Sequence, residues 1–163
     1  MNGVNDMFQK PLDVGGGGSG AAVRLSNFTE RHFIFDGVEC ASIEGVLQSF
    51  KFKDIEEQRK VCALIGIKAK KAGMKTDWRP MQTLYWNGRE FPRDSADYQE
   101  LLDRLFLEVL NQNPAFVSDL YQTGEHKLIH SLGKDDIRKS ILTEREFCDR
   151  LERMRDIVKN MFS

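Results

Sequence analysis

The sequence predicts an α+β fold that is mostly helical and includes a small antiparallel β element. Three observations indicate this class. Apolar residues recur at helical spacing along several segments. Two short apolar runs are each divided by a dipeptide, Asp36-Gly37 or Asn87-Gly88, that is typical of tight hairpin turns. Residues that favour helix starts, such as Ser42, stand directly before the helical patterns.

The composition is that of one soluble domain with a buried core. The chain has 163 residues, of which 40% are hydrophobic and 30% charged, and this excludes a wholly disordered protein. The 24 basic and 25 acidic residues give a net charge of −1, which excludes a uniformly basic nucleic-acid binder but not a local basic patch. No apolar run is long enough to cross a bilayer, so no membrane partner is expected. Three cysteines without a CxxC pair indicate reduced thiols and a cytoplasmic location.

Residues 1–22 are expected to form a flexible Gly-rich N-terminal tail, and residues 23–163 a single domain. The tail contains the run GGGGSG, whose composition gives flexibility and little to bury. A phosphate-binding loop would need a Lys-Ser or Lys-Thr pair after the last glycine, where this chain has Ala21-Ala22. A mobile tail or a linker is therefore the favoured interpretation.

Two hairpins account for the β element. The first is expected from residues 32–35 and 38–41, and the second from residues 84–86 and 89–91. The glycine in each turn accepts the positive φ that such turns require. Residues 128–130 are a candidate for one further short strand.

The first half of the domain is expected to contain a helix capped by Ser42, with further helical segments after it. Residues 53–71 form one or two helices in this interpretation. They break near Gly66 and stop at Gly73, because glycine favours helix ends.

The second half is expected to be helical from Asp97 onward. The helix that begins there has the widest apolar stripe and is placed at the centre of the fold. Asn113 begins the next helix and Gly124 ends it. Thr143 and Glu146 fit a capping box that begins an extra C-terminal helix. The inward residues expected for that helix are Phe147, Leu151, Met154 and Val158.

The helix after Ser42 carries a polar stripe that suits catalysis. Glu44, Gln48 and Lys51 are spaced i, i+4 and i+7, so they lie nearly in line on one face. The helix dipole favours the carboxylate form of Glu44 in the first turn. A carboxylate beside an amide and an ammonium group is suited to polarise a water and to bind a polar ligand. The alternative, which spacing alone favours, is the solvated face of an ordinary amphipathic helix.

Two tryptophans, Trp78 and Trp86, stand near Arg79 and Arg89. An aromatic ring beside arginine suits stacking on a nucleobase together with a phosphate contact. The alternative is that both rings belong to the core or its rim. This alternative is at least as good for Trp86, which falls in an expected strand.

Residues 51–79 form a positive island in a neutral protein, with nine basic and four acidic residues. Such an island would attract a diphosphate or a nucleic-acid backbone, and the attraction would weaken with salt. Surface lysines on ordinary helices produce similar counts, which is the alternative.

The histidines provide no metal motif. His32, His126 and His130 each lack a second His or Cys at ligand spacing, so no metal is expected. A nucleophilic pair of Ser131 and His130 is rejected because adjacent residues of a strand point to opposite faces. Residues 133–136 are expected to form an exposed turn.

Several tracts recur in an order and spacing that resemble a known family. They are residues 25–28 (LSNF), 35–37 (FDG), 42–52 (Ser42-Ile43-Glu44 through Gln48 to Lys51-Phe52), 69–73 (AKKAG), 78–81 (WRPM), 113–114 (NP) and 120–124 (LYQTG). The first three are similar to the S-N-F, F-x-G, S-x-E-H and Q-x-x-K-F pattern of the NADAR (YbiA-like) family of N-glycosidases. The resemblance covers roughly residues 25–136, and the chain is identified as a divergent member.

The resemblance implies a YbiA-like fold and a hydrolase that cleaves the N-glycosidic bond of an ADP-ribosylated base or a related ribosylated nucleotide. An ADP-ribose-like nucleotide or ADP-ribosylated nucleic acid would be the partner, and no cofactor or metal would be required. By the same resemblance, Glu44 would be the catalytic carboxylate and Lys51 its charge partner. The substrate-binding residues so implied are Asn27, Phe28, Gln48, Lys70, Trp78, Arg79 and Asp135.

Departures from the family pattern leave two other functions open. Gly45 stands where the family commonly has His, which removes a base or sugar contact, and residues 130–136 lack the family's late Trp-Gly. One alternative is therefore a degenerate module that binds ADP-ribose-like nucleotides without cleaving them. The other is an interaction protein whose last helix, from Thr143, docks a partner.

Overall fold

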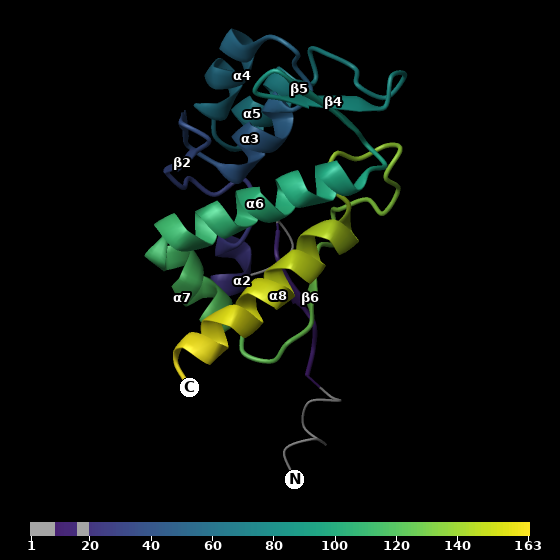
Figure 1. Ribbon diagram of the computed structural model, residues 1–163. Coiled ribbons are helices and arrows are strands. Elements are labelled where there is room, and N and C mark those ends of the chain that lie inside the picture. Colours follow the sequence, from purple (N-terminus) through teal and green to yellow (C-terminus); the bar gives the residue numbers. More distant parts are fainter. Residues whose placement is uncertain (1–8, 16–19) are drawn as a thin grey trace.

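The computed structural model describes residues 9–15 and 20–163, and they fold around one long helix. This helix, α6 (Ala96–Gln112), crosses the middle of the molecule between two groups of elements (Figure 1). The group above it is α3 (Ile43–Ser49), α4 (Ile55–Cys62), α5 (Gly66–Gly73), β2 (Phe33–Phe35), β3 (Val38–Cys40), β4 (Thr83–Trp86) and β5 (Arg89–Pro92). The group below it is β1 (Leu12–Asp13), α2 (Gly20–Arg24), α7 (Pro114–Gln122), β6 (Leu128–Ile129) and α8 (Glu144–Met161). The mostly helical α+β class is confirmed.

Apolar side chains of both groups meet in one hydrophobic core, with α6 at its centre as expected. The buried stripe of α6 recurs at helical spacing from Tyr98 to Leu110. Tyr98 is fully buried, and its hydroxyl donates a hydrogen bond to the Ile141 carbonyl oxygen (2.5 Å). The helix therefore joins the segment before α8 to the upper group through both apolar and polar contacts.

Both predicted hairpins form, because their turns have the backbone that the dipeptides favour. Asp36 and Gly37 have φ of 47° and 80° between β2 and β3. Asn87 and Gly88 have φ of 53° and 88° between β4 and β5. Glycine adopts positive φ because it lacks a Cβ, and Asp and Asn tolerate it because their short side chains hydrogen-bond locally, so the local sequence determines the register of each hairpin.

α8 begins with the predicted capping box, and its Glu146 also closes a buried ion pair. Thr143 Oγ1 accepts a hydrogen bond from the Glu146 N–H (3.1 Å), and the Thr143 N–H donates to Glu146 Oε1 (2.8 Å). Arg93, which is 1% exposed, donates two hydrogen bonds to the same carboxylate (2.5 and 3.1 Å). Gln99 Nε2 donates a further one to Glu146 Oε2 (2.6 Å). Glu146 thus links α8 to both β5 and α6.

The predicted inward residues of α8, from Phe147 to Val158, are all buried in the core. The helix therefore stabilises its own domain with these residues, while Ile157 and Met161 near its end remain exposed. No helix among the described residues combines the length and the apolar character that crossing a membrane requires.

The N-terminal segment is more ordered than the expected tail over residues 1–22. β1 pairs in parallel with β6, Leu12 opposite Leu128, and Val14 is fully buried. α2 then begins at Gly20. The prediction that order begins near Val23 is therefore wrong for these residues, because a two-residue pairing with a remote strand has almost no local sequence signal. Most of the glycine run, residues 16–19, and residues 1–8 lie outside the described part.

Candidate functional site

The candidate site is built on α3, a short helix that is buried on nearly every side. Ser42 Oγ accepts a hydrogen bond from the Gly45 N–H (3.0 Å), which caps the helix as predicted. The same hydroxyl donates to the Leu64 carbonyl oxygen (2.7 Å), so the cap also ties α3 to the segment between α4 and α5. The helix ends at Ser49, and Lys51 follows in the next turn. The elements around α3 therefore determine where Glu44 and Gln48 point.

Glu44 is held at both its backbone and its carboxylate. Its N–H donates to the Asn27 carbonyl oxygen (3.0 Å), and its Oε1 accepts from Gln48 Nε2 (2.8 Å). Among the described residues, no hydrogen bond to Oε2 is formed, which leaves that oxygen available to orient a water. Burial raises the pKa of Glu44, and the Gln48 hydrogen bond and the charges of Lys51 and Lys70 oppose the rise without cancelling it.

The polar stripe that begins on α3 is only partly solvated, since Gln48 is buried and Glu44 and Lys51 are half-buried, which disfavours the amphipathic alternative. Gln48 is 6% exposed, and Lys51 is half-buried. Burial lowers the pKa of Lys51, while the nearby Glu44 carboxylate raises it. A partly buried carboxylate beside a half-buried ammonium group interacts more strongly than the same pair in water, because the local dielectric constant is lower.

Gly73, which the sequence marked only as a helix stop, fixes the Gln48 amide. A Cβ at position 73 would overlap Gln48 Oε1 and lie 2.7 Å from its Cδ. The amide therefore occupies the space of a side chain on α5, and its Nε2 is directed at Glu44. Gly73 is a positioning residue that spacing on α3 alone does not reveal.

We expect Gly73→Ala to impair the function of Glu44 indirectly, by displacing the Gln48 amide. The added methyl group would push the Gln48 amide off the carboxylate, and Glu44 would lose a hydrogen bond that lowers its pKa. The rate of any reaction that depends on ionised Glu44 should fall, and the acid limb of the pH profile of that rate should move to higher pH. Gln48→Ala should have the same two effects, and the double variant should add little to either single change. Additive losses would show that Gly73 acts elsewhere.

Asn27, Phe28 and Lys70 lie at the border of this stripe. Asn27 is 8% exposed, and its Oδ1 is buried without a hydrogen-bond partner among the described residues. The Phe28 ring is 39% exposed and packs against the start of α5 at Gly66. Lys70 is exposed on α5, yet its charge acts on both Glu44 and Lys51. The structure thus brings these three predicted residues near Glu44.

The two tryptophans belong to the core, which corrects their proposed role as stacking surfaces. Trp86 stacks on Phe35 (ring centroids 5.2 Å apart), and its Nε1 donates to Asp36 Oδ2 (2.8 Å). Trp78 is 6% exposed and packs in the hydrophobic core. At 3% and 6% exposed, Trp86 and Trp78 present almost no surface to a nucleobase, so the core alternative is favoured for both.

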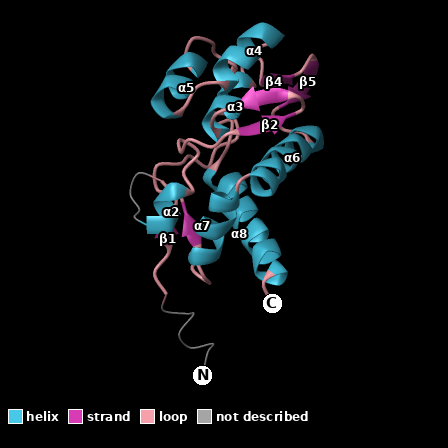
Figure 2. Ribbon diagram, turned by 90° about the vertical axis from the view of Figure 1, so that its left-hand side faces the viewer, coloured by secondary structure: helices cyan, strands magenta, loops and turns pink. Residues whose placement is uncertain are grey.

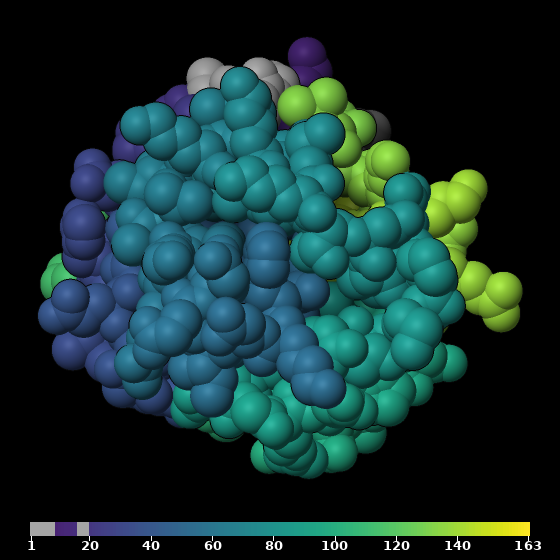
Figure 3. All heavy atoms as spheres, turned by 90° about the horizontal axis from the view of Figure 1, so that it is seen from above, coloured from purple at the N-terminus to yellow at the C-terminus, as the bar shows by residue number. Residues whose placement is uncertain are grey.

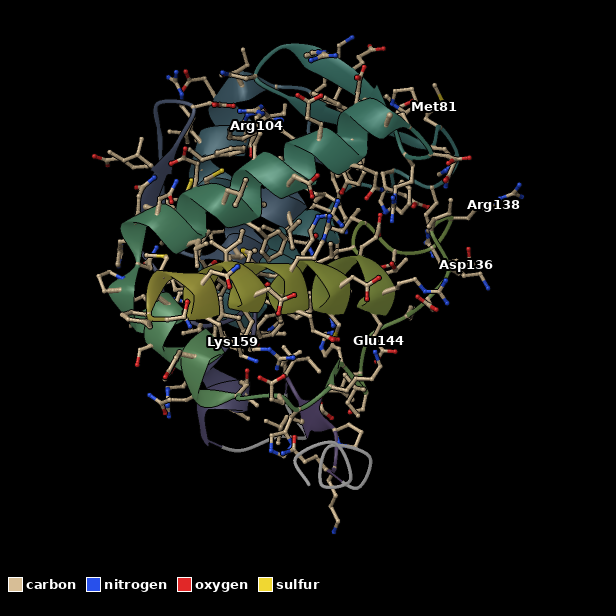
Figure 4. The ribbon with its side chains drawn as sticks, turned by 60° about the horizontal axis from the view of Figure 1, so that its bottom comes forward. Met81, Arg104, Asp136, Arg138, Glu144 and Lys159 are labelled. Carbon is tan, nitrogen blue, oxygen red and sulfur yellow. The ribbon has the colours of Figure 1, made fainter. Side chains whose placement is uncertain are left out.

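Arg79 and Asp135 lie further from the carboxylate. Arg79 is exposed and pairs with Asp77 (2.9 Å). The charges of both residues act on the pKa of Lys51. Asp135 pairs with Arg145 at the start of α8 (3.5 Å). Its loop does lie beside the turn that follows Trp78 (Figure 4, near the labels Met81 and Arg138), where Gln82 Nε2 donates to the Arg138 carbonyl oxygen (2.9 Å). Among the described residues, no hydrogen bond or ion pair joins Asp135 to Glu44, and its place in the same site stays a prediction.

Gly45 faces α4, which explains its departure from the family pattern. A Cβ there would lie 2.8 Å from the Leu64 oxygen, 2.9 Å from the Val61 oxygen and 3.0 Å from the Cys62 oxygen. Any side chain would therefore enter the backbone at the end of α4. The expectation that Gly45 removes a ligand contact is wrong, since position 45 points away from the polar stripe of Glu44.

Two hollows of the surface lie away from this site. One, of about 690 Å³, separates α6 from α8 and is lined by charged residues such as Asp103 and Arg153 that pair with each other. The other, of about 620 Å³, is an apolar groove between α7 and the end of α8. Neither contains Glu44 or Lys51. Within the described part of the chain, no group of three or more His, Cys, Asp or Glu is placed to hold a metal ion.

Three comparisons with known proteins agree with this architecture. A family model described as bacteriophage protein GP30.3 matches residues 20–156. An uncharacterised 17.1 kDa protein from the Gp30–rIII intergenic region of Enterobacteria phage T4 is 36% identical over 137 residues, which are 81% of this chain and 88% of that protein. The NMR structure of the Escherichia coli protein YbiA superposes with a TM-score of 0.60 over 96% of this chain and 92% of that chain, at 13% identity. The chain therefore belongs to the bacteriophage GP30.3 protein family, and its fold is that of YbiA.

Proposed function

We propose that this protein is a hydrolase that cleaves the N-glycosidic bond of an ADP-ribosylated base or a related ribosylated nucleotide. The similarity of its motifs to the NADAR pattern, together with its YbiA-like fold, supports this class of reaction. The single observation that carries the proposal is the partly buried carboxylate of Glu44, which accepts a hydrogen bond from Gln48 (2.8 Å) and interacts with the charge of Lys51.

The chemistry requires one negative charge and one water. As the bond between ribose C1 and the base nitrogen breaks, positive charge develops on the sugar, and a fixed carboxylate stabilises it. The water adds its oxygen to C1, and its proton goes to the departing nitrogen. Glu44 Oε2 is the group that would orient this water. Lys51 and Lys70 would face the negative phosphates of the substrate.

The rate is expected to follow a bell-shaped pH profile. Glu44 must be ionised, and burial raises its pKa, so the acid limb should have its midpoint above the ordinary value for glutamate. Lys51 must be protonated, and burial lowers its pKa, so the midpoint of the alkaline limb should lie below the ordinary pKa of lysine. Initial rates across the pH range measure both limbs. A flat profile would contradict the assigned pair.

The direct test is to incubate the protein with ADP-ribosylated DNA, ADP-ribosylated RNA and free ADP-ribosyl nucleosides, and to measure the ADP-ribose released. Release in proportion to enzyme concentration supports the proposal. Tight ligand binding by calorimetry with no release from any substrate would overturn it in favour of the degenerate binding module.

A further inference from the structure

Two cysteines from different elements meet at the contact between β3 and α4. Cys40 ends β3, Cys62 ends α4, and the two elements pack against each other. The Ala41 N–H donates a hydrogen bond to the Cys62 carbonyl oxygen (2.9 Å), which fixes the two backbones side by side. In Figure 2, α3 lies directly below α4 and beside α5, so the pair is close to the helix that carries the candidate site.

The side chains of Cys40 and Cys62 also contact each other. Each thiol is within hydrogen-bonding reach of the other. Cys40 is 4% exposed, and Cys62 is fully buried. Two neighbouring thiols form a disulfide when their side chains can bring the sulfurs to a bond length of about 2 Å. The pair is therefore placed to form a disulfide without a large movement of the chain.

The surroundings make the two thiols chemically different. Hydrogen bonds with Cys40 and Ser49 lower the pKa of Cys62, and they outweigh the opposing effect of burial. The hydrogen bond with Cys62 and burial both raise the pKa of Cys40. Cys62 is therefore the nucleophile of the pair, because the thiolate is the reactive form of cysteine.

Burial determines which oxidant reaches the pair. α4 forms part of the surface at the top of the molecule (Figure 3), and Cys62 lies on the buried side of this helix. A peroxide is little larger than water, so it can enter when the end of α4 opens locally. Cys148 on α8 provides a comparison, since it is also buried, and burial and nearby acidic residues raise its pKa to about 12.

The end of α4 is packed too tightly against α3 to move alone. A Cβ on Gly45 would lie only 3.0 Å from the Cys62 carbonyl oxygen. Ser42 Oγ, which caps α3, donates to the Leu64 carbonyl oxygen (2.7 Å) just beyond the end of α4. Drawing the two sulfurs from hydrogen-bonding reach to bonding distance displaces Cys62. We expect this displacement to pass to α3 and thus to Glu44.

We infer that Cys40 and Cys62 form a peroxide-sensitive dithiol whose disulfide acts on the candidate site through α3. The Cys62 sulfur attacks one peroxide oxygen, which gives a sulfenic acid and one water. The Cys40 sulfur then attacks the sulfur of that sulfenic acid. The S–S bond forms, and the sulfenic hydroxyl leaves with the Cys40 proton as a second water. The two thiols together lose two electrons, and these reduce the peroxide to water.

The first test counts thiols after treatment of the whole protein with hydrogen peroxide. Unfolding and alkylation with a maleimide should label one cysteine of the three in the wild type, and all three after dithiothreitol. A tryptic digest without reductant should contain a peptide that joins Cys40 to Cys62. Cys148→Ala should still form this crosslink, and Cys62→Ala, the same change at another buried helix position, should form none. Three free thiols in the treated wild type, or a crosslink that includes Cys148, would overturn the inference.

Activity tests the coupling to α3, and this readout rests on the proposed function. Peroxide should slow ADP-ribose release by wild type and Cys148→Ala about tenfold or more, since a small displacement of a catalytic group is costly. Dithiothreitol should restore the rate, and Cys62→Ala should keep its rate in peroxide. A disulfide that leaves the wild-type rate unchanged would refute the coupling.

A third readout does not depend on catalysis. If the untreated wild type releases no ADP-ribose from any substrate, the proposed function fails. Deuterium exchange at the Gly45 amide, which donates to Ser42 Oγ (3.0 Å), then reports whether the disulfide acts on α3. Exchange should change on oxidation of the wild type and not in Cys62→Ala, and equal exchange before and after oxidation of the wild type would overturn the inference.

Discussion

Replacing Glu44 with glutamine is expected to slow the proposed N-glycoside cleavage by about 10²- to 10⁴-fold. Glutamine has nearly the same shape, and its Oε1 can still accept the hydrogen bond that Gln48 Nε2 donates. The variant loses the negative charge, and its second carboxylate oxygen becomes an amide donor, so both roles proposed for Glu44, stabilising the sugar cation and orienting the water, are removed. Single-turnover release of ADP-ribose from wild type and variant measures the loss.

Stability provides the control for this variant. Burial raises the pKa of Glu44 in the folded state, so its stabilising contribution is present below the pKa of the unfolded chain and is lost as pH rises through the folded pKa. At neutral pH, Glu44→Gln should therefore have a Tm equal to or above that of the wild type. Glu39→Gln, at an exposed position of β3, should change neither rate nor Tm. An unchanged rate in Glu44→Gln would remove Glu44 from the reaction.

Replacing Glu146 with alanine is expected to destabilise the fold by about 3–5 kcal/mol, because it leaves a buried arginine without its partner. Arg93 is 1% exposed and donates two hydrogen bonds to this carboxylate. The same change removes half of the capping box of α8. Urea unfolding gives the free energy of unfolding, with an unchanged m-value as evidence of two-state behaviour.

A second alanine variant tests whether burial causes this effect. Glu125 is likewise paired with a cation, Lys159 (2.5 Å), but its side chain is 64% exposed, so Glu125→Ala should cost at most about 1 kcal/mol of stability.

The buried pair should also make stability depend on pH. Burial raises the pKa of Glu146, but hydrogen bonds from Arg93 and its other partners outweigh this and lower the pKa overall. Its contribution is present above the pKa of the unfolded chain and is lost as pH falls through the folded pKa. The free energy of unfolding of the wild type should therefore decrease in acid, and that of the Glu146 variant should not show this decrease. Equal costs for the two variants would contradict the assigned role of the pair.

The elements that the sequence predicted correctly are those whose cause is local. A turn such as Asp36-Gly37 determines its own backbone, and a cap such as Thr143 satisfies N–H groups within one turn. The apolar period of α6 determined its buried face in the same way. Such features need no knowledge of the rest of the chain, so the hairpins and most helix limits could be predicted.

The features that were missed depend on contacts between remote segments. The spacing of Glu44 and Gln48 showed that they share a face, but only α5 packing through Gly73 buries that face. Trp78 stands among polar neighbours in the sequence and nevertheless packs in the core. Position 45 could not be assigned a direction until the end of α4 was placed beside it. The candidate carboxylate was therefore predictable, and its surroundings were not.

The pairing of β1 with β6 has a consequence for the order in which this chain folds. All elements from α2 to α7 lie between Leu12 and Leu128, so closing this pair costs more chain entropy than forming either hairpin. We expect such a contact to form late during folding and to open early during unfolding. The amides of Leu12 and Val14, which donate to Lys127 and Ile129, should therefore exchange with deuterium before those in the middle of α6.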